Sequence, residues 1–404
     1  MISDSVRQYF SPEHERMVEE LLAETRANGG VAPLDVERFW ADQEKAGKDP
    51  FGDIPQLPLG IRMSGECVYD ELGIPEDYWR YQHDEAWRLE LNKVYNDKAE
   101  QIVGRRLLNE KPSDPAMQWP AVKTLADLFE GEQVWFPGTW GWWLQESAHN
   151  EEELAALVDR VDARLENLRA FLLPENWNEE KARLNALGAK PPRYRGQRGP
   201  VTFAASIYGV ENLLYLIMDN EPLAGRFRDT ILRAMLGIAR VLDEEAGDTP
   251  ETAPHGFSFA DDNCYLLSPE MYEFFGYPIL KAIFDIYSPN PGDSRYQHSD
   301  SAMGHLLPLL GRLNMTGVNF GPTVMPDEIR KYLPNAVIHG QLAPFTFSRN
   351  DEAGIIAELL RDFTMTRERK GLVFSTAGSI NNGSRLTGMR LIMAGIQRYC
   401  RYDG

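Results

Sequence analysis

Cysteine is scarce in this chain of 404 residues. The three cysteines, Cys67, Cys264 and Cys400, are odd in number and far apart, and no Cys-X-X-Cys pair occurs. Disulfide frameworks and structural zinc knuckles both need closely spaced cysteines. The sequence therefore predicts neither.

Basic residues are also in deficit. The 42 lysines and arginines face 61 aspartates and glutamates, which gives a formal net charge of −19. Phosphate backbones and anionic membranes require a basic face, so we expect no nucleic-acid partner and no membrane partner. No apolar run approaches the roughly 18 residues of a membrane span, and the first residues lack the basic and apolar regions of a secretory signal. We therefore expect a cytoplasmic protein.

Nucleotide-binding motifs are absent as well. No Gly-X-Gly-X-X-Gly follows a predicted strand, and no Gly-X-X-X-X-Gly-Lys-Ser/Thr occurs. These motifs place backbone amides and a helix N-terminus against phosphates. Their absence disfavours dinucleotide-binding and P-loop folds.

Strand and helix patterns alternate from residue 199 to the end of the chain. Such alternation indicates a parallel α/β architecture, and a closed barrel fits it best. We predict an α/β fold with a (β/α)8 TIM barrel at residues 115–404 and an N-terminal helical extension at residues 1–114 packed on it. The predicted strands lie at residues 134–136, 199–206, 257–260, 295–297, 316–320, 336–339 and 372–375.

Polar residues gather where several of these strands end. In a (β/α)8 barrel the residues at the C-terminal ends of the strands build the active site. We therefore predict five catalytic residues: Asp261, Asp262, His298, Asp300 and His339. A solvated loop capped by Asp261 and Asp262 is the alternative for that pair.

His298 and Asp300 are two residues apart on a segment read as extended, so both side chains point to one face. They could share a metal ion, or act as a base and the group that orients it. A buried acid beside a second acid has a raised pKa and could donate a proton near neutrality. The alternative is a satisfied polar pair in the core.

Other residues at the predicted barrel mouth are candidates for binding the substrate. A tryptophan cluster, Trp140, Trp142 and Trp143, could cover an apolar or quaternary-ammonium group through cation–π contact, although aromatic clusters also form ordinary core. The predicted substrate-binding residues are Arg62, Trp140, Tyr208, Gln341, Ser379 and Asn381.

The C-terminal half resembles the uroporphyrinogen decarboxylase superfamily, which includes methyltransferases that act with corrinoid proteins or coenzyme M. The resemblance covers about residues 199–402 and rests on stretches such as DDNCYLLSPEMYEFFGYPILKAIFD, YQHSDSAMGHLLPLLGRLNMTGVNF and LVFSTAGSINNGSRLTGMRLIMAGIQRYCRY. It implies a (β/α)8 barrel with the active site at the C-terminal mouth.

Two departures from the superfamily narrow the expected chemistry. Members that process uroporphyrinogen carry a signature close to MRQAGR, whereas this chain has a single arginine, Arg62, in IRMSG. A substrate with many carboxylates is therefore not expected. Zinc-dependent members use His-X-Cys and a later cysteine, where this chain has Asp300 and Thr376–Ser379, so a thiolate-held zinc is not expected either.

The resemblance and the strand-end residues together favour an enzyme. The leading hypothesis is a methyltransferase or demethylase that moves a methyl group from a small methylated donor to a corrinoid protein or a thiol cofactor. The alternatives are a cofactor-independent decarboxylase, in which Asp261 or Asp262 protonates a carbanion, and a non-catalytic ligand-binding barrel. No cofactor is certain: a divalent metal and a corrinoid carried by a partner protein are the candidates, and a homodimer is left open.

Overall fold

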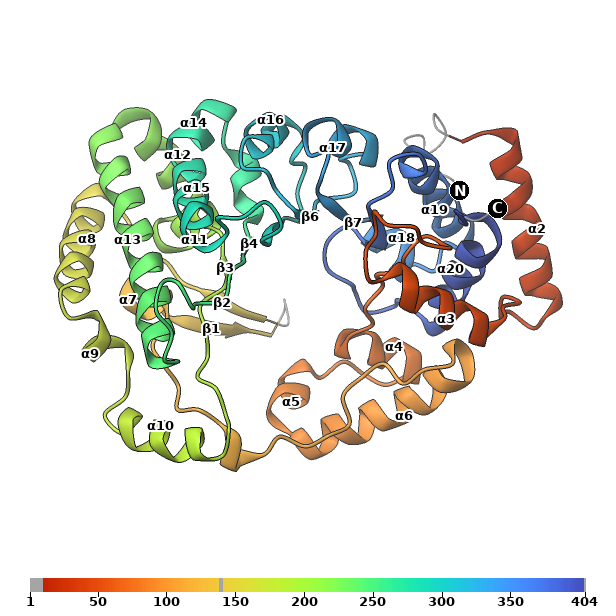
Figure 1. The fold of residues 1–404 in the computed structure, drawn as a ribbon, viewed down its shortest axis with the longest axis horizontal. Helices are drawn as coiled ribbons and strands as arrows, with labels where there is room; N and C mark the ends of the chain where they lie inside the picture. Colours follow the sequence, from red (N-terminus) through yellow and green to blue (C-terminus); the bar gives the residue numbers. More distant parts are fainter. Residues whose placement is uncertain (1–9, 138–140, 403–404) are drawn as a thin grey trace. The chain divides into compact units, whose positions relative to one another are not determined.

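The computed structural model describes residues 10–137 and 141–402. The chain divides into two compact units, and each is described by itself. The first comprises residues 1–112, 299–304 and 317–404, and the second comprises residues 113–298 and 305–316. Figure 1 shows the elements of both units in chain order.

The second unit contains three parallel strands in the order β3-β4-β5. These are β3 (Gly196–Arg198), β4 (Phe257–Ala260) and β5 (Arg295–His298). In their register Arg198 pairs with Ala260, and Ala260 pairs with His298, so the three strands end level with one another. Residues that follow β4 and β5 therefore emerge at the same edge.

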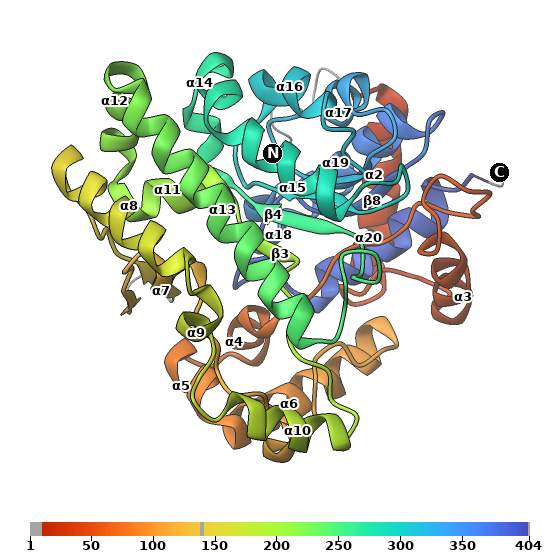
Figure 2. The same ribbon diagram turned by 60° about the vertical axis from the view of Figure 1, so that its left-hand side comes forward.

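Helices connect these strands. The chain passes from β3 to β4 through α11 (Pro200–Tyr208), α12 (Val210–Asp219) and α13 (Glu221–Glu245). It passes from β4 to β5 through α14 (Pro269–Phe274) and α15 (Gly276–Tyr287). The remaining helices of this unit are α7 (Leu125–Leu128), α8 (Glu151–Leu165), α9 (Leu168–Leu172), α10 (Trp177–Ala186) and α16 (Leu307–Gly311). Helices α8 and α13 pack together and lie side by side in Figures 1 and 2.

The strand predicted at residues 199–206 is wrong, because this segment forms helix α11. Eight of its nine residues are buried, so the apolar run carries no period that separates a strand from a fully buried helix. Pro200 occupies the first turn, where its missing N–H costs no hydrogen bond. The strand lies just before it, in the polar segment β3.

The barrel strand predicted at residues 134–136 is also wrong. Strand β1 (Gln133–Phe136) pairs antiparallel with β2 (Gly141–Leu144) in a two-stranded sheet. Trp142 and Trp143 on β2 are 45% and 50% exposed, which excludes a core role for them. Trp140 lies outside the described residues.

The first unit contains the other three parallel strands, in the order β6-β7-β8. They are β6 (Gly317–Asn319), β7 (Val337–Leu342) and β8 (Leu372–Thr376). The helices that connect or follow them are α17 (Pro326–Tyr332), α18 (Pro344–Ser348), α19 (Glu352–Thr366) and α20 (Leu386–Tyr399).

A segment from the N-terminal part of the chain lies beside β8. Leu59 forms an isolated parallel bridge with Phe374, and the Gly60 amide donates to the Phe374 carbonyl at 2.7 Å. A Cβ at Gly60 would lie 2.6 Å from a methyl of Val373, so only glycine allows this approach. The bridge places the segment that carries Arg62 next to the last strand of the unit.

The N-terminal part is otherwise mainly helical. Its helices are α2 (Pro12–Ala27), α3 (Val36–Ala46), α4 (Val68–Leu72), α5 (Tyr78–His83) and α6 (Glu85–Val103). Helix α2 packs on α19 and α20, and α6 packs on α20.

Four short 3-10 helices complete the described elements: Gly65–Cys67, Pro115–Met117, Asp262–Leu266 and Gly304–Leu306. Within the described ranges no single helix is long and apolar enough to cross a membrane, although the bent pair α11 and α12 together reach that length and composition.

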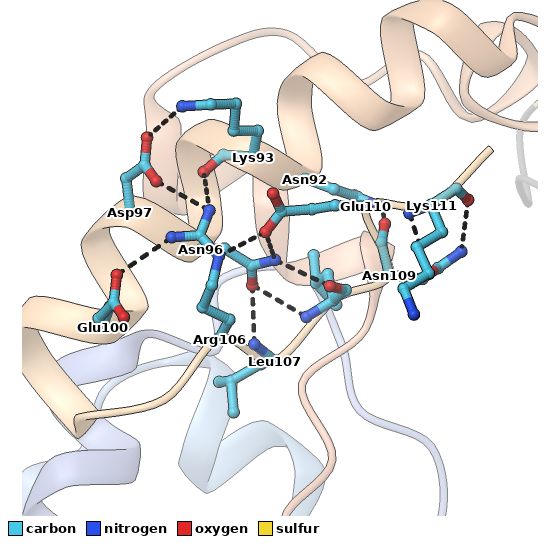
Figure 3. Close-up of polar contacts among 11 residues, drawn as sticks. Asn92, Lys93, Asn96, Asp97, Glu100, Arg106, Leu107, Asn109, Glu110 and Lys111 are labelled. Atoms are coloured by element: carbon cyan, nitrogen blue, oxygen red, sulfur yellow. Dashed lines mark hydrogen bonds and ion pairs between the residues drawn. The ribbon is translucent and has the colours of Figure 1, made fainter.

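Asn96 holds the loop that follows α6 (Figure 3). Its carbonyl oxygen accepts hydrogen bonds from the Leu107 and Leu108 amides at 2.8 and 2.9 Å. Its amide nitrogen donates to the Leu108 carbonyl at 2.8 Å and to the Glu110 carboxylate at 2.6 Å. Asn96 is fully buried, and the loop residues that it bonds are half-buried, so one buried side chain supplies partners for four groups of the loop.

Replacing Asn96 with alanine is expected to lower the free energy of unfolding by roughly 2–3 kcal/mol, because it removes four hydrogen bonds to the half-buried loop and leaves a cavity at a buried position. Chemical denaturation followed by circular dichroism measures the loss. The exposed Asn109 is the matched control, and its alanine variant is expected to stay within about 0.5 kcal/mol of the parent. Equal losses in the two variants would contradict this role of Asn96.

Candidate active site

Asp262 and His298 come together at the ends of β4 and β5. Past the last paired residues, the Asp261 amide donates to the His298 carbonyl at 2.9 Å, which extends the pairing of the two strands. Asp262 is the next residue in the chain, and one of its carboxylate oxygens lies within 4.8 Å of a ring nitrogen of His298. Both side chains are half-buried. The structure therefore brings together two of the five residues predicted as catalytic, in one unit.

The neighbouring carboxylate of Asp261 has a different environment. It is fully buried and accepts a hydrogen bond from the Thr202 amide at 2.8 Å, in the first turn of α11. Burial raises the pKa of Asp261 to about 6, and the hydrogen bonds from the Thr202 and Val201 amides act in the opposite direction. A Cβ at Gly199 would lie 2.0 Å from that of Asp261, so glycine is needed at this approach. Asp261 therefore contacts the N-terminus of a helix, while Asp262 lies beside His298.

In the first unit, Asp300 contacts the loop that follows β8. The Ser379 hydroxyl donates to the Asp300 carboxylate at 3.4 Å. A Cβ at Gly378, whose φ is +110°, would lie 2.6 Å from a carboxylate oxygen of Asp300. The glycine thus permits both the turn and the close approach. Asp300 and Ser379 are exposed, so both remain accessible to a ligand.

The charge of Arg62 acts on His339 in the same unit. His339 lies on β7 and is half-buried, and Arg62 is exposed. Burial lowers the pKa of His339, and the positive charge of Arg62 lowers it further. Both causes disfavour the imidazolium, so His339 is set up as a neutral imidazole near pH 7.

Comparison with known proteins gives the family. The family model described as uroporphyrinogen decarboxylase matches residues 186–399, which is more than half of the chain. The chain belongs to the uroporphyrinogen decarboxylase family. A solved structure of a methyltransferase from Methanosarcina mazei is similar in fold, with a TM-score of 0.52 and 15% sequence identity over 90% of this chain and 98% of that one. No curated protein matches.

The predicted fold class is confirmed by these matches. Both the uroporphyrinogen decarboxylase family and the matched methyltransferase have TIM-barrel folds. The family match lies within the region in which strands and helices alternate and includes β3 to β8.

The cysteines of this family member do not fit a thiolate-held zinc. All three are buried. Burial raises the pKa of Cys67 to about 11, and it holds the pKa values of Cys264 and Cys400 well above the ordinary range of a thiol. The Cys264 thiol donates to the Asp261 carbonyl at 2.8 Å. Zinc binds the thiolate form, and these buried thiols do not favour it. The metal site predicted at His298 and Asp300 stays a prediction.

Three of the predicted substrate-binding residues have contacts within the fold. Gln341 is fully buried, and its amide nitrogen donates to the carbonyls of Gly321 and Val324 at 3.1 and 2.7 Å. Tyr208 is 3% exposed at the end of α11. Asn381 is half-buried, and its carbonyl accepts from the Ser384 amide at 3.2 Å. Their roles in substrate binding stay predictions.

Sequence reasoning missed Asn319, at the end of β6. It is 5% exposed, and its amide nitrogen donates to the carbonyls of His339 and Thr376, the latter at 3.0 Å. One side chain thus ties the middle of β7 to the end of β8 and holds the backbone of His339. The sequence signal that could have predicted this role is an asparagine at the end of a short apolar strand.

Glu358 on α19 is a second residue that the sequence did not reveal. Its carboxylate accepts from the Ala343 amide and the Thr346 hydroxyl, both at 2.7 Å, and so holds the N-terminal part of α18, which follows β7. Burial raises its pKa from 4.5 to about 7. The residue occupies an ordinary position in a helical pattern, so its burial became apparent only in the fold.

Stability is expected to fall as the pH rises from about 4.5 to 7. In this window folded Glu358 holds a proton that the unfolded chain has released, so raising the pH favours unfolding, by up to about 3 kcal/mol for this group. Thermal melts across this range measure the slope. Replacing Glu358 with glutamine should reduce it, and an unchanged slope in the variant would show that this carboxyl is not the cause.

Proposed function

We propose that this protein is a methyltransferase that moves a methyl group from a small methylated donor to a corrinoid carried by a partner protein or to a thiol cofactor. The observation that carries the proposal is the Asp262–His298 pair, a carboxylate and an imidazole within 4.8 Å at the ends of adjacent parallel strands. Strand ends are where barrels of this class hold their reacting groups. The matched structure described as a methyltransferase supports the same reaction class.

The pair suits the proton transfer that such a reaction needs. The bond between the methyl carbon and the donor heteroatom breaks, and its electron pair stays on the heteroatom, which takes a proton. Protonated His298 supplies that proton, and the Asp262 carboxylate orients the ring and stabilises its charged form. The corrinoid or thiol supplies the electron pair that forms the new bond to carbon.

A carboxy-lyase is the second candidate, and the family match favours it. In that reaction the bond to the leaving carboxylate breaks, carbon keeps the electron pair, and an acid at the site protonates it. Asp262 or His298 would donate the proton. The single arginine in the IRMSG segment argues against uroporphyrinogen itself as the substrate.

The test is a substrate panel. Purified protein is incubated with methanol, methylamines, glycine betaine and methylated thiols, with reduced cobalamin or a small thiol as acceptor, and demethylated product is measured by mass spectrometry. Release of carbon dioxide from carboxylated compounds is measured in parallel. Demethylation of one donor supports the proposal, release of carbon dioxide alone supports the lyase, and binding without turnover supports a ligand-binding barrel.

The proposed cytoplasmic location, a corrinoid-protein partner and a homodimer each have a direct measurement. Cell fractionation tests the location, co-purification with a corrinoid protein tests the partner, and light scattering tests the dimer. Metal analysis of the parent and of the His298→Ala variant tests whether His298 helps to hold a divalent ion. Equal metal content in the two proteins would argue against a metal at this residue.

A further inference from the structure

Thr202, in the first turn of α11, contacts the chain on both sides of Asp262. Its amide donates to the Asp261 carboxylate at 2.8 Å. Its hydroxyl oxygen accepts from the Asn263 amide at 2.9 Å. Thr202 is 7% exposed, so water competes little for either bond. The three-residue segment 261–263 is thus held at both ends by one residue of a different element.

We propose that Thr202 is a positioning residue that holds Asp262 opposite His298. This inference rests on the proposed function, because it assigns Thr202 a role in placing the acid–base pair. Asp262 is the first residue of the 3-10 helix that follows β4, and Asp261 lies between the two elements. The bond from the Asp261 amide to the His298 carbonyl fixes one side of Asp262, and Thr202 fixes the other.

The chemistry of threonine suits this position. The amides of the first helical turn have no partner inside their own helix, so the Thr202 amide is available to the Asp261 carboxylate. The negative charge of that carboxylate is favoured at a helix N-terminus. Branching at Cβ restricts the Thr202 side chain to few rotamers, which keeps the hydroxyl directed at Asn263. The same residue therefore holds the segment through its backbone and its side chain.

The expected effect is a loss of rate without a loss of substrate binding. Thr202→Val keeps the branched shape and removes the oxygen that accepts from Asn263. Misplacing a reacting group by about 1 Å costs up to roughly 100-fold in rate. We expect kcat on the donor identified by the panel to fall about tenfold to 100-fold with KM within about twofold. Thr202→Ser keeps the hydroxyl and is expected to restore most of kcat.

Two further measurements need no substrate. Hydrogen exchange of the peptide containing Asn263 should be faster in Thr202→Val than in the parent, with Thr202→Ser close to the parent. A crystal structure of Thr202→Val should show the Asp262 carboxylate farther from His298. If the valine variant folds poorly, Thr202→Ala removes the same oxygen without adding a methyl group. Unchanged exchange together with an unchanged Asp262–His298 distance in the variant overturns the proposal.

The failure of this inference is distinguishable from the failure of the proposed function. No turnover of any donor in the panel would overturn the proposed function, and the exchange and distance measurements would still test Thr202. Full activity in Asp262→Asn would overturn the positioning role but not methyl transfer, because the residue being positioned would not be needed. Loss of activity in Asp262→Asn with full activity in Thr202→Val would overturn only the positioning role. A lower melting temperature of Thr202→Val with unchanged kcat per folded molecule would mean that Thr202 contributes only to stability. That result would also overturn the positioning role.

Discussion

Replacing His298 with alanine is expected to lower kcat by roughly 10²- to 10⁴-fold, the usual contribution of a positioned acid or base. The imidazole is half-buried at the end of β5, with the Asp262 carboxylate within 4.8 Å. Because its backbone pairing with β4 does not use the side chain, the strand is expected to form without the ring. The melting temperature should therefore change by only a few degrees.

Steady-state kinetics of the methyl transfer, with thermal melts on the same samples, measure both effects. His305→Ala is the matched control, since this exposed histidine lies seven residues further on and its ring nitrogen bonds the Leu267 carbonyl at 3.0 Å. Its activity should stay within about twofold of the parent. A large loss of stability in His298→Ala, with activity retained by the folded fraction, would mean that His298 is part of the core rather than of the site.

Replacing Asp362 with alanine is expected to destabilise the protein by about 3–5 kcal/mol, because it leaves a buried charge without its partner. The side chains of Arg361 and Asp362 are 3% and 0% exposed, and the guanidinium donates to the carboxylate at 2.7 Å. The pair also holds the backbone of Gln341, whose amide donates to Asp362 and whose carbonyl accepts from Arg361, both at 3.3 Å. Replacing Asp362 is therefore expected to weaken the packing of β7 as well.

Denaturant unfolding of three variants tests this prediction. The double replacement Arg361→Met with Asp362→Leu removes both charges and should cost less than Asp362→Ala alone, since a buried ion pair can be replaced by apolar side chains at little cost. Asp285→Asn breaks an exposed pair with Lys281 on α15 and should stay within about 1 kcal/mol of the parent. A double variant less stable than the single one would show that the pair itself is strongly stabilising.

The sequence alone located much of the barrel region. The strands predicted at residues 257–260 and 372–375 match β4 and β8, and those at 316–320 and 336–339 overlap β6 and β7. These strands are short apolar runs bounded by turn residues, so local pattern was sufficient. The meeting of the acids after β4 with the histidine of β5 was predicted from the fold class, since parallel strands of a barrel bring their C-terminal ends to one edge.

Only the tertiary structure showed which element a segment forms, and what a side chain contacts, where the local sequence carries no pattern. Residues 199–205 are all buried and Ser206 is half-buried, so this sequence has no period that marks a helix, and β3 is too polar to read as a strand. Asp261 and Asp262 are identical in type and adjacent in the chain, and only the packing of α11 separates them: Asp261 contacts its first turn, and Asp262 lies beside His298. Thr202, Asn319 and Glu358 act on residues more than ten positions away, and hydrogen bonds between distant segments depend on the assembled fold rather than on local sequence.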